Sequence, residues 1–121
     1  LIKKIVDFAK EAKQPFLDVG AGYGRLTKLL INEGAKVICN EIDFHHLIYA
    51  RQQIQPQHYD RLHLNNKRFP DEMNFEEGSL SGIILHRIIH FLSPQEIESG
   101  FQKIFDWLEP GGKVFIAVLP P

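Results

Sequence analysis

Hydrophobic and polar residues follow two patterns along this chain, amphipathic segments and short runs that are apolar almost throughout. In the amphipathic segments apolar residues recur every three to four positions, which predicts helices that bury one face. The apolar runs have the length of strands and carry few polar side chains, which predicts strands buried on both faces. The expected helices cover residues 1–13, 26–33, 43–53 and 93–108, and the expected strands cover residues 16–19, 35–40, 61–64, 82–86 and 113–119.

Residues with strong positional preferences mark several ends of these segments. Gly34 suits the left-handed residue that follows the second helix. Asp43 is a suitable N-cap for the third helix. The fourth helix opens with a complete signal, since Ser93 can cap it, Pro94 suits its first position and Glu96 stands where a capping box needs an acid.

The order of the segments predicts the fold class. Strands alternate with helices along the whole chain, and this alternation of buried strands and helices is typical of a parallel sheet covered by helices on both sides. The polar residues 65–79 show no period and are expected to form a loop. No repeat and no internal boundary is evident, so we expect residues 1–121 to form a single α/β domain.

Composition and charge narrow the class of protein. Of the 121 residues 44% are hydrophobic, and 14 basic and 15 acidic residues give a net charge of −1, which disfavours binding to nucleic acids or membranes through bulk electrostatics. No apolar run approaches the roughly 20 residues that span a bilayer. The single cysteine, Cys39, favours a reducing compartment, so we expect a cytoplasmic location. Because the chain starts without Met and stops just after an apolar strand, we also expect it to be part of a longer protein.

Three glycines at alternate positions, Gly20, Gly22 and Gly24, join the first strand to the second helix. A tight strand-to-helix turn requires positive φ angles, and a surface without side chains lets a ligand reach backbone N–H groups. The spacing is G-x-G-x-G and not the G-x-G-x-x-G of dinucleotide-binding turns, because Arg25 occupies the place of the third glycine. We therefore expect a ligand site that differs from a dinucleotide site.

Two acids flank this turn in the expected fold. Asp18 lies just before the glycines, where a carboxylate would repel a pyrophosphate but would suit a ligand with a positive charge. Glu41 comes 19 residues after Gly22, at the end of the second strand, where an acid can accept both hydroxyls of a ribose. The two acids predict a ligand that contains a ribose and a cationic part and that is not held mainly by phosphates.

The stretch Phe16–Arg25 resembles the first motif of the class I S-adenosylmethionine-dependent methyltransferases, in which two hydrophobic residues and an acid precede three alternating glycines. Further segments resemble later motifs of the same family in the same order: the second strand with its acid, the fourth strand with the segment after it, and a Leu-x-Pro-Gly-Gly turn into the fifth strand. These segments are Val37–Asp43, Leu80–Leu92 and Leu108–Ala117. The resemblance covers nearly the whole chain.

The resemblance implies a Rossmann-like three-layer sandwich whose mostly parallel sheet has about five strands in the order 3-2-1-4-5, with helices on both faces. In this family a sixth and a seventh strand lie beside the fifth, and both are missing here, so the chain resembles a truncated core. Val114, Ile116 and Val118 would then lie on an exposed strand edge, which natural domains avoid. We expect a missing C-terminal segment or a partner, such as another copy in an oligomer, to cover this edge.

The resemblance also implies the cofactor, S-adenosylmethionine, and the residues that hold it. The turn from Gly20 to Gly24, Ala21 included, would hold the methionine part, and Asp18 would support its amino-acid end. Glu41 would bind the ribose hydroxyls, and Ile42 would lie against the adenine.

Two positions depart from the pattern of the family. Asn66 or Lys67 stands near the place where the family has an acid that contacts the adenine amine, and Asn66 is our candidate for this contact. Leu80 and Ser81 replace the Phe-Asp pair with which the fourth strand usually begins.

His86, at the end of the fourth strand, is the candidate catalytic residue. The ligand crevice of such a sheet lies at the carboxyl ends of its strands, where the crossover direction reverses. His86 would face this crevice, beside the cofactor and near the acceptor, as a base or as a group that orients the acceptor. The alternative is a strand-end histidine bonded to the backbone. His86 and His90 lie four residues apart, but no further ligand is close in sequence, so we expect no metal.

The function expected from this resemblance is methyl transfer from S-adenosylmethionine to an unidentified acceptor, most simply a small molecule. Dimethylation of rRNA adenine is disfavoured, because Leu85-His86-Arg87-Ile88 stands where that family has an Asn-x-Pro-Tyr segment and no basic groove is evident. Two other classes stay open: a non-catalytic module that keeps the nucleotide pocket, and an NAD-binding oxidoreductase domain, which the glycine spacing and Asp18 oppose.

Overall fold

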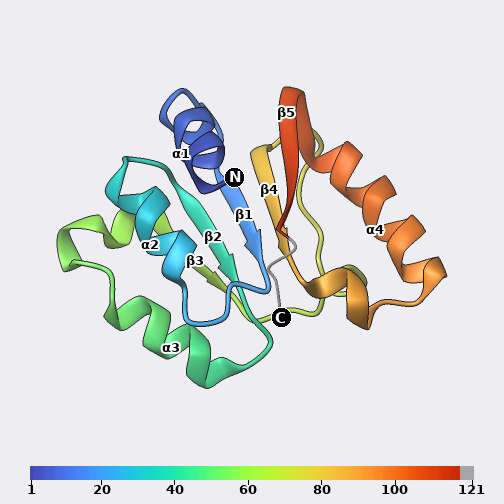
Figure 1. The fold of residues 1–121 in the computed structure, drawn as a ribbon, viewed down its shortest axis with the longest axis horizontal. Helices are drawn as coiled ribbons and strands as arrows, with labels where there is room; N and C mark the ends of the chain where they lie inside the picture. Colours follow the sequence, from blue (N-terminus) through green and yellow to red (C-terminus); the bar gives the residue numbers. More distant parts are fainter. Residues whose placement is uncertain (118–121) are drawn as a thin grey trace.

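The computed structural model describes residues 1–117 and places five strands in one sheet (Figure 1). The strands are β1 (Phe16–Val19), β2 (Val37–Asn40), β3 (Leu62–Asn65), β4 (Leu80–His86) and β5 (Leu108–Ala117). Their order across the sheet is β3-β2-β1-β4-β5, and each neighbouring pair is parallel. The order expected from the sequence is confirmed.

Helices cover both faces of the sheet, as expected for a three-layer sandwich. In Figure 1, α1, α2 and α3 lie on one side of the view and α4 lies on the other. Phe16 and Ile84 belong to the cluster that includes α1 and α2, whereas Leu17 and Leu85 belong to the cluster that includes α4, because successive strand residues point to opposite faces. The helices are α1 (Ile2–Lys10), α2 (Arg25–Asn32), α3 (Phe44–Gln52) and α4 (Pro94–Trp107), with 3-10 turns η1 (Pro56–Arg61) and η2 (Ile88–Phe91).

The segment 66–79, between β3 and β4, contains neither helix nor strand, as the sequence indicates, but it is not a surface loop. Its Phe69 and Met73 are buried on the α4 face of the sheet. A Cβ added at Gly100 of α4 would lie 3.0 Å from the Phe69 ring, so the glycine allows the helix to approach this segment closely. The segment therefore supplies part of the core that a helix would otherwise supply.

Several boundaries differ from the sequence expectation. β2 begins at Val37 and not at residue 35, and β4 begins at Leu80 and not at residue 82. The first helix ends at Lys10 and not at residue 13, because the chain has to turn there into β1, and the fourth ends at Trp107. β5 begins at Leu108, since Leu108 already pairs with Leu80 before an irregularity that accommodates the Pro-Gly-Gly turn. Residues 118 and 119 of the expected last strand, including Val118, lie outside the described residues.

The parallel register brings the ends of three strands to one edge of the sheet. Val19 pairs with Leu85, and Asp18 pairs with both Ile84 and Cys39, so β1, β2 and β4 end at nearly the same level. Among residues 1–117, no helix is both long enough and apolar enough to cross a membrane.

Candidate functional site

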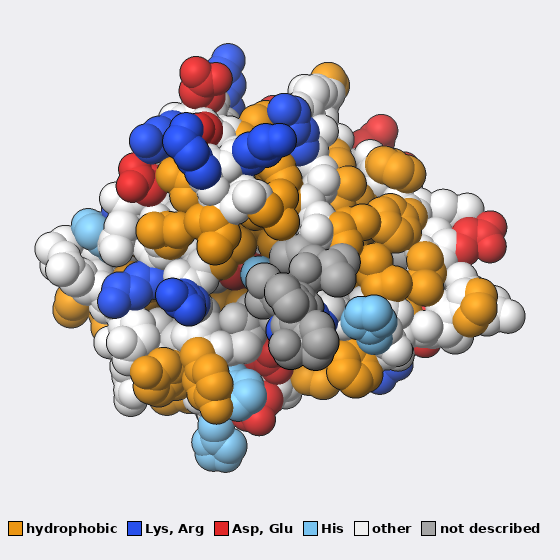
Figure 2. Space-filling model, in the orientation of Figure 1, with side chains coloured by type: hydrophobic (Ala, Val, Ile, Leu, Met, Phe, Trp, Pro, Cys, Tyr) orange, Lys and Arg blue, Asp and Glu red, His pale blue; other side chains and the backbone are white. Residues whose placement is uncertain are grey.

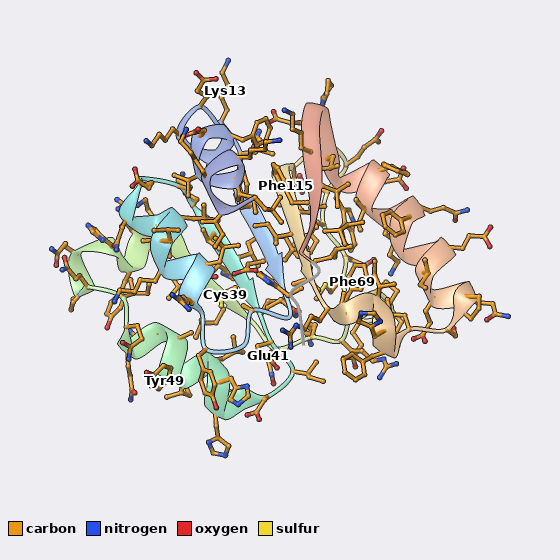
Figure 3. The ribbon with its side chains drawn as sticks, in the orientation of Figure 1. Lys13, Cys39, Glu41, Tyr49, Phe69 and Phe115 are labelled. Atoms are coloured by element: carbon orange, nitrogen blue, oxygen red, sulfur yellow. The ribbon has the colours of Figure 1, made fainter. Side chains whose placement is uncertain are left out.

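A cleft with a volume of about 250 Å³ lies at the edge of the sheet where β1, β2 and β4 end. This is the edge at which the sequence predicts the crevice. Figure 3 shows Glu41 close to the end of β2, on this edge. The residues that line the cleft are Gly20, Asn40, Glu41, Ile42, Arg68, Phe69, His86, Ile88, Phe91 and Leu92.

The glycine turn has positive φ angles at all three glycines, and two of them show why glycine is needed. At Gly24 (φ 81°) an added Cβ would lie 2.5 Å from the Cβ of Ala50, so the turn packs directly on α3. At Gly22 (φ 61°) an added Cβ would meet no atom within 4 Å, so this part of the turn is open. The turn is thus packed on one side and accessible on the other.

The backbone N–H groups of the turn are already bonded within the protein. Gly20 N–H donates to the Asn40 side chain (3.2 Å), Ala21 N–H to the Asn40 carbonyl (2.8 Å) and Gly22 N–H to the Glu41 carboxylate (3.1 Å). Gly24 N–H donates to the Ala21 carbonyl (3.0 Å). The expectation that a ligand reaches these N–H groups is therefore wrong for these four, because neighbouring residues already use them. These four N–H groups are therefore not free to bind a pyrophosphate.

Glu41 holds the turn and still has capacity to accept hydrogen bonds. One carboxylate oxygen accepts from Gly22 N–H (3.1 Å), and the other accepts from Asp43 N–H (2.8 Å). A carboxylate offers about four lone-pair sites, so roughly two remain. A half-buried acid of this kind, on the wall of the cleft, can accept the two hydroxyls of a ribose, as the sequence suggests.

Asn40 is a site residue that the sequence analysis does not identify. Its side chain is 2% exposed, accepts from Gly20 N–H, and donates to the side chain of Asn65 (2.9 Å) and the carbonyl of Lys67 (2.7 Å). Asn40 therefore ties the glycine turn to the end of β3. The available signal was a polar side chain at the end of an otherwise apolar strand.

Asn66 lies beside the predicted ligand acid. Its side-chain amide nitrogen donates to the carbonyl oxygens of Glu41 (2.8 Å) and Ile42 (3.1 Å). Because both partners are acceptors, the NH₂ group has to face them, and the amide orientation is defined by the network. The Oδ1 atom of Asn66 is then left as an acceptor next to Ile42, which is 68% exposed on the wall of the cleft.

Asp18 lies beneath the turn rather than on its surface. The residue is fully buried, and its two carboxylate oxygens contact the Thr27 hydroxyl (2.6 Å) and Nε2 of His86 (2.6 Å). A direct contact to a cofactor would require Asp18 to exchange one of these partners, and this contact stays a prediction. The structure instead connects Asp18 to the candidate catalytic histidine.

His86 lines the cleft with a side chain that is 20% exposed. Burial by itself would lower the pKa of His86, but the hydrogen bond and the negative charge of Asp18 outweigh it, and the pKa is raised above its usual value. The partner of Nε2 is a carboxylate and not the backbone, unlike the alternative considered from sequence. His90, four residues after His86, is exposed, and the expectation of no metal stays a prediction.

The cleft has an apolar wall that the sequence analysis does not foresee. Phe69, Ile88 and Leu92 come from the segment 66–79 and from η2, and none of them shows a periodic signal. Arg68, also on the wall, is paired with Glu96 at 3.1 Å and Asp71 at 3.4 Å. The cleft thus combines one acid, an apolar wall and a guanidinium that is already neutralised.

The ring of Tyr23, in the glycine turn, packs against α3. Its ring lies 4.4 Å from the His46 ring and 5.2 Å from the Tyr49 ring, measured between centroids, and the residue is 61% exposed. Figure 3 shows Tyr49 on α3, and in Figure 2 hydrophobic and histidine side chains gather at the lower edge of the same face. These rings form an exposed rim next to the turn.

Comparisons with known proteins agree with the fold. A family described as "methyltransferase domain" matches residues 16–112. Phosphoethanolamine N-methyltransferase 1 of Triticum aestivum is 29% identical over 107 residues, which are 87% of this chain and 21% of that protein. Ribosomal RNA small subunit methyltransferase A of Mycoplasma mobile is 27% identical over 93 residues, 77% of this chain and 35% of that protein. The chain thus spans about a fifth to a third of these relatives.

A solved structure supports the same fold. The glycopeptide N-methyltransferase MtfA, complexed with S-adenosylmethionine, superposes with a TM-score of 0.76 at 22% identity, and the match covers 95% of this chain and 48% of that chain. The family match runs from the start of β1 to the Pro-Gly-Gly turn and includes the glycine turn, Glu41 and the end of β4. The chain therefore belongs to the methyltransferase domain family, and its likeness to the class I enzymes is confirmed.

Proposed function

We propose that this domain binds S-adenosylmethionine in the cleft and transfers its methyl group to an acceptor. The observation that carries the proposal is the arrangement of Glu41, which accepts from Gly22 N–H and keeps acceptor capacity on the cleft wall beside an open glycine turn. Ribose hydroxyls are the ligand groups that match such an acid.

The remaining surface of the cleft fits the other parts of this cofactor. Ile42 on one side and Ile88 and Leu92 on the other offer apolar surface for the adenine, and Oδ1 of Asn66 can accept from its amine. The methionine part would lie along the open side of the glycine turn, near Gly22. These assignments extend the resemblance of the sequence. Ile42, Ile88 and Leu92 line the cleft, whereas Gly22 and Asn66 lie outside its lining and are hydrogen-bonded to Glu41, which belongs to it.

The alternative of an NAD-binding domain finds less support in the site. In a dinucleotide site the pyrophosphate uses N–H donors of the glycine turn, and here the N–H groups of Gly20, Ala21 and Gly22 are bonded to Asn40 and Glu41. Asp18 and Glu41 add negative charge around this turn. A ligand without phosphates fits better.

Bound S-adenosylmethionine supplies a methyl group made electrophilic by a sulfonium. The chain itself has to bind the acceptor in line with this methyl group and to exclude water, which is chiefly positioning. An acceptor that loses a proton also needs a base, and His86 is the titratable histidine on the cleft wall.

A small-molecule acceptor is the simplest proposal. The wheat relative is named for phosphoethanolamine, and the Mycoplasma relative for ribosomal RNA. The net charge of −1 does not provide the basic surface that RNA binding uses, and on the face in Figure 2 the Lys and Arg side chains gather mainly on the upper part, with acidic side chains beside them. We therefore favour a small acceptor over RNA.

The two departures from the family pattern, at Ser81 and Asn66, give little support to a non-catalytic module once their contacts are considered. Ser81 lies near the start of β4, far from its carboxyl end, where it accepts from Gln14 N–H and donates to Glu109, so its identity does not affect the cleft. The acid missing near Asn66 is replaced by an amide oxygen that can accept from adenine.

The test of the proposed function is transfer of a labelled methyl group from S-adenosylmethionine. Phosphoethanolamine and a set of small amines and alcohols would be compared with ribosomal RNA, using Glu41→Gln as the impaired variant. Transfer to a small molecule that Glu41→Gln reduces supports the proposal. Cofactor binding without transfer to any acceptor supports the module, and transfer only to RNA contradicts the acceptor class.

We also propose that another segment or a partner copy covers β5. Within the described residues β5 pairs only with β4, and Ile116 is 41% exposed. Light scattering of the chain in solution tests whether a partner copy covers β5. If one does, the measured mass is that of at least two copies. The cytoplasmic location likewise stays a proposal.

A further inference from the structure

Asp18, which is buried, and His86, which is partly exposed, form a pair that joins the glycine turn to the cleft wall. Asp18 is fully buried at the end of β1, and its Oδ1 lies 2.6 Å from Nε2 of His86 at the end of β4, 68 residues later in the chain. The second oxygen of Asp18 accepts from the Thr27 hydroxyl at 2.6 Å, so the carboxylate is held on both sides.

This pairing determines which ring nitrogen of His86 carries the proton. An ionised carboxylate only accepts hydrogen bonds, so Nε2 has to be the protonated nitrogen of the neutral ring. Nδ1 is then left with a lone pair, and within residues 1–117 no hydrogen-bond partner is assigned to it. Because His86 lines the cleft, Nδ1 is the ring nitrogen that a ligand can use.

The other charged or titratable groups near His86 lie farther from its ring than Asp18 does. Glu41 from the end of β2 and Arg68 from the segment 66–79 line the same cleft, and Arg68 is paired with Glu96. Cys39 of β2 lies near Asp18 and is neutral, because burial and nearby acids raise its pKa to about 12 despite the opposing hydrogen bond with Thr27. On the segment of His86 itself, Arg87 and His90 are exposed. Asp18 is therefore the group in direct contact.

We propose that Asp18 is a positioning residue, which holds His86 so that Nδ1 accepts a proton from the methyl acceptor. This inference rests on the proposed function. It specifies the acceptor class as a hydroxyl or an amine that arrives protonated. A hydroxyl gives its proton to Nδ1 of His86 as its oxygen attacks, whereas a protonated amine first gives its proton to Nδ1 and then attacks with the lone pair that this frees. In both cases the attacking atom forms its bond to the methyl carbon as the carbon–sulfur bond breaks, and the electron pair of that bond stays on sulfur.

The arrangement predicts a spectroscopic signature that needs no acceptor. In the chain labelled with ring-¹⁵N histidine, long-range ¹H–¹⁵N spectra report the tautomer and the titration of each of the six histidines. His86 is assigned by the signals that disappear in His86→Gln. We expect a neutral ring protonated at Nε2 and a pKa of His86 above the usual value of histidine. A ring protonated at Nδ1, or a pKa of His86 at or below the usual value, overturns the proposal.

The variant Asp18→Asn should lower the titration of His86 and mix its tautomers, whereas the control Asp7→Asn, on the exposed face of α1, should change neither. If Asp18→Asn does not fold, Thr27→Val, which frees one side of the carboxylate, takes its place, and the wild-type spectrum still decides the tautomer. If the Asp18→Asn variant folds and neither the tautomer nor the titration of His86 changes, the positioning role of Asp18 is overturned.

Addition of ligands distinguishes a wrong placement of Nδ1 from a failure of the chain to bind the cofactor. S-adenosylhomocysteine lacks the positive charge at sulfur, so in the S-adenosylmethionine complex at the same pH we expect the ratio of protonated to neutral His86 to be at least about three-fold lower. Equal ratios in two saturated complexes overturn the placement of Nδ1 beside the reacting centre. If neither ligand shifts any resonance, the proposed function itself fails, whatever the tautomer of His86.

Discussion

The carboxylate of Glu41 accepts a hydrogen bond from the backbone N–H of Gly22 at 3.1 Å and thereby joins the end of β2 to the glycine turn. The two residues lie 19 positions apart, and their contact brings the turn and the proposed ribose acid to one wall of the cleft. The proposed ligand specificity rests on this contact, because it occupies an N–H of the turn that a pyrophosphate could use and leaves an acid that can accept from ribose hydroxyls.

Replacement of Glu41 tests this contact. Glu41→Gln removes the charge and one acceptor oxygen, so we expect affinity for S-adenosylhomocysteine to fall by about 10- to 100-fold, the effect of losing hydrogen bonds to a charged group. Titration calorimetry measures the change. The matched control is Glu33→Gln, which alters an exposed pair with Lys10 away from the cleft and should bind as the wild type does. Equal affinity of Glu41→Gln and the wild type would remove Glu41 from the site.

Gly24 gives a prediction about stability. In Gly24→Ala the new Cβ would combine a φ of 81° with a 2.5 Å approach to Ala50, and we expect the free energy of unfolding to fall by about 2 kcal/mol or more. Gly34→Ala is the control, because Gly34 has a φ of 97° but open space around it, so that only the backbone cost of about 1 kcal/mol applies. Urea denaturation compares the two, and a Gly34→Ala loss as large as that of Gly24→Ala would contradict the packing argument.

The alternation of helices and strands made a parallel sheet covered by helices predictable, and the resemblance to the methyltransferase family implied the order of its strands. Glu41 was a predictable candidate, since the end of a buried strand next to a glycine turn is a recognisable place for an acid. The contact between Asp18 and His86 was not predictable from the sequence. The two residues lie 68 positions apart, and only the register of β1 against β4 brings them together.

The apolar wall of the cleft shows a second limit of sequence reasoning. Phe69 and Met73 lie in a segment without period, and their burial depends on the close approach that Gly100 allows on α4. Neither propensity nor periodicity within the segment carries this information. Asn66 was located near the adenine position by resemblance, but the direction of its amide follows only from the two carbonyls that it contacts.

The raised pKa of His86 predicts a pH-dependent contribution to stability. A histidine whose folded pKa lies above its unfolded pKa stabilises the fold below the unfolded value, and this contribution is lost as the pH rises through the folded value. The difference in the free energy of unfolding between wild type and His86→Gln should therefore be larger at pH 6 than at pH 9. Urea denaturation at both pH values measures it, with exposed His90→Gln as the control. A difference that grows with pH would contradict the direction of the pKa shift.

Cys39 is expected to be unreactive in the folded chain. Its thiol is fully buried, and burial, with the nearby acids and against the Thr27 hydrogen bond, raises its pKa to about 12, so only about one thiol in ten thousand is ionised at pH 8. A thiol reagent such as DTNB should modify it at the rate of unfolding and rapidly in urea. Rapid modification without denaturant would show that Cys39 is accessible in the native state.

The central claim is the identity of the ligand, and calorimetric titration of the chain with S-adenosylhomocysteine and with NAD tests it most directly. We predict saturable binding of S-adenosylhomocysteine at one site, weakened by Glu41→Gln, and no binding of NAD at the same concentrations. Binding of NAD without binding of S-adenosylhomocysteine would contradict the account.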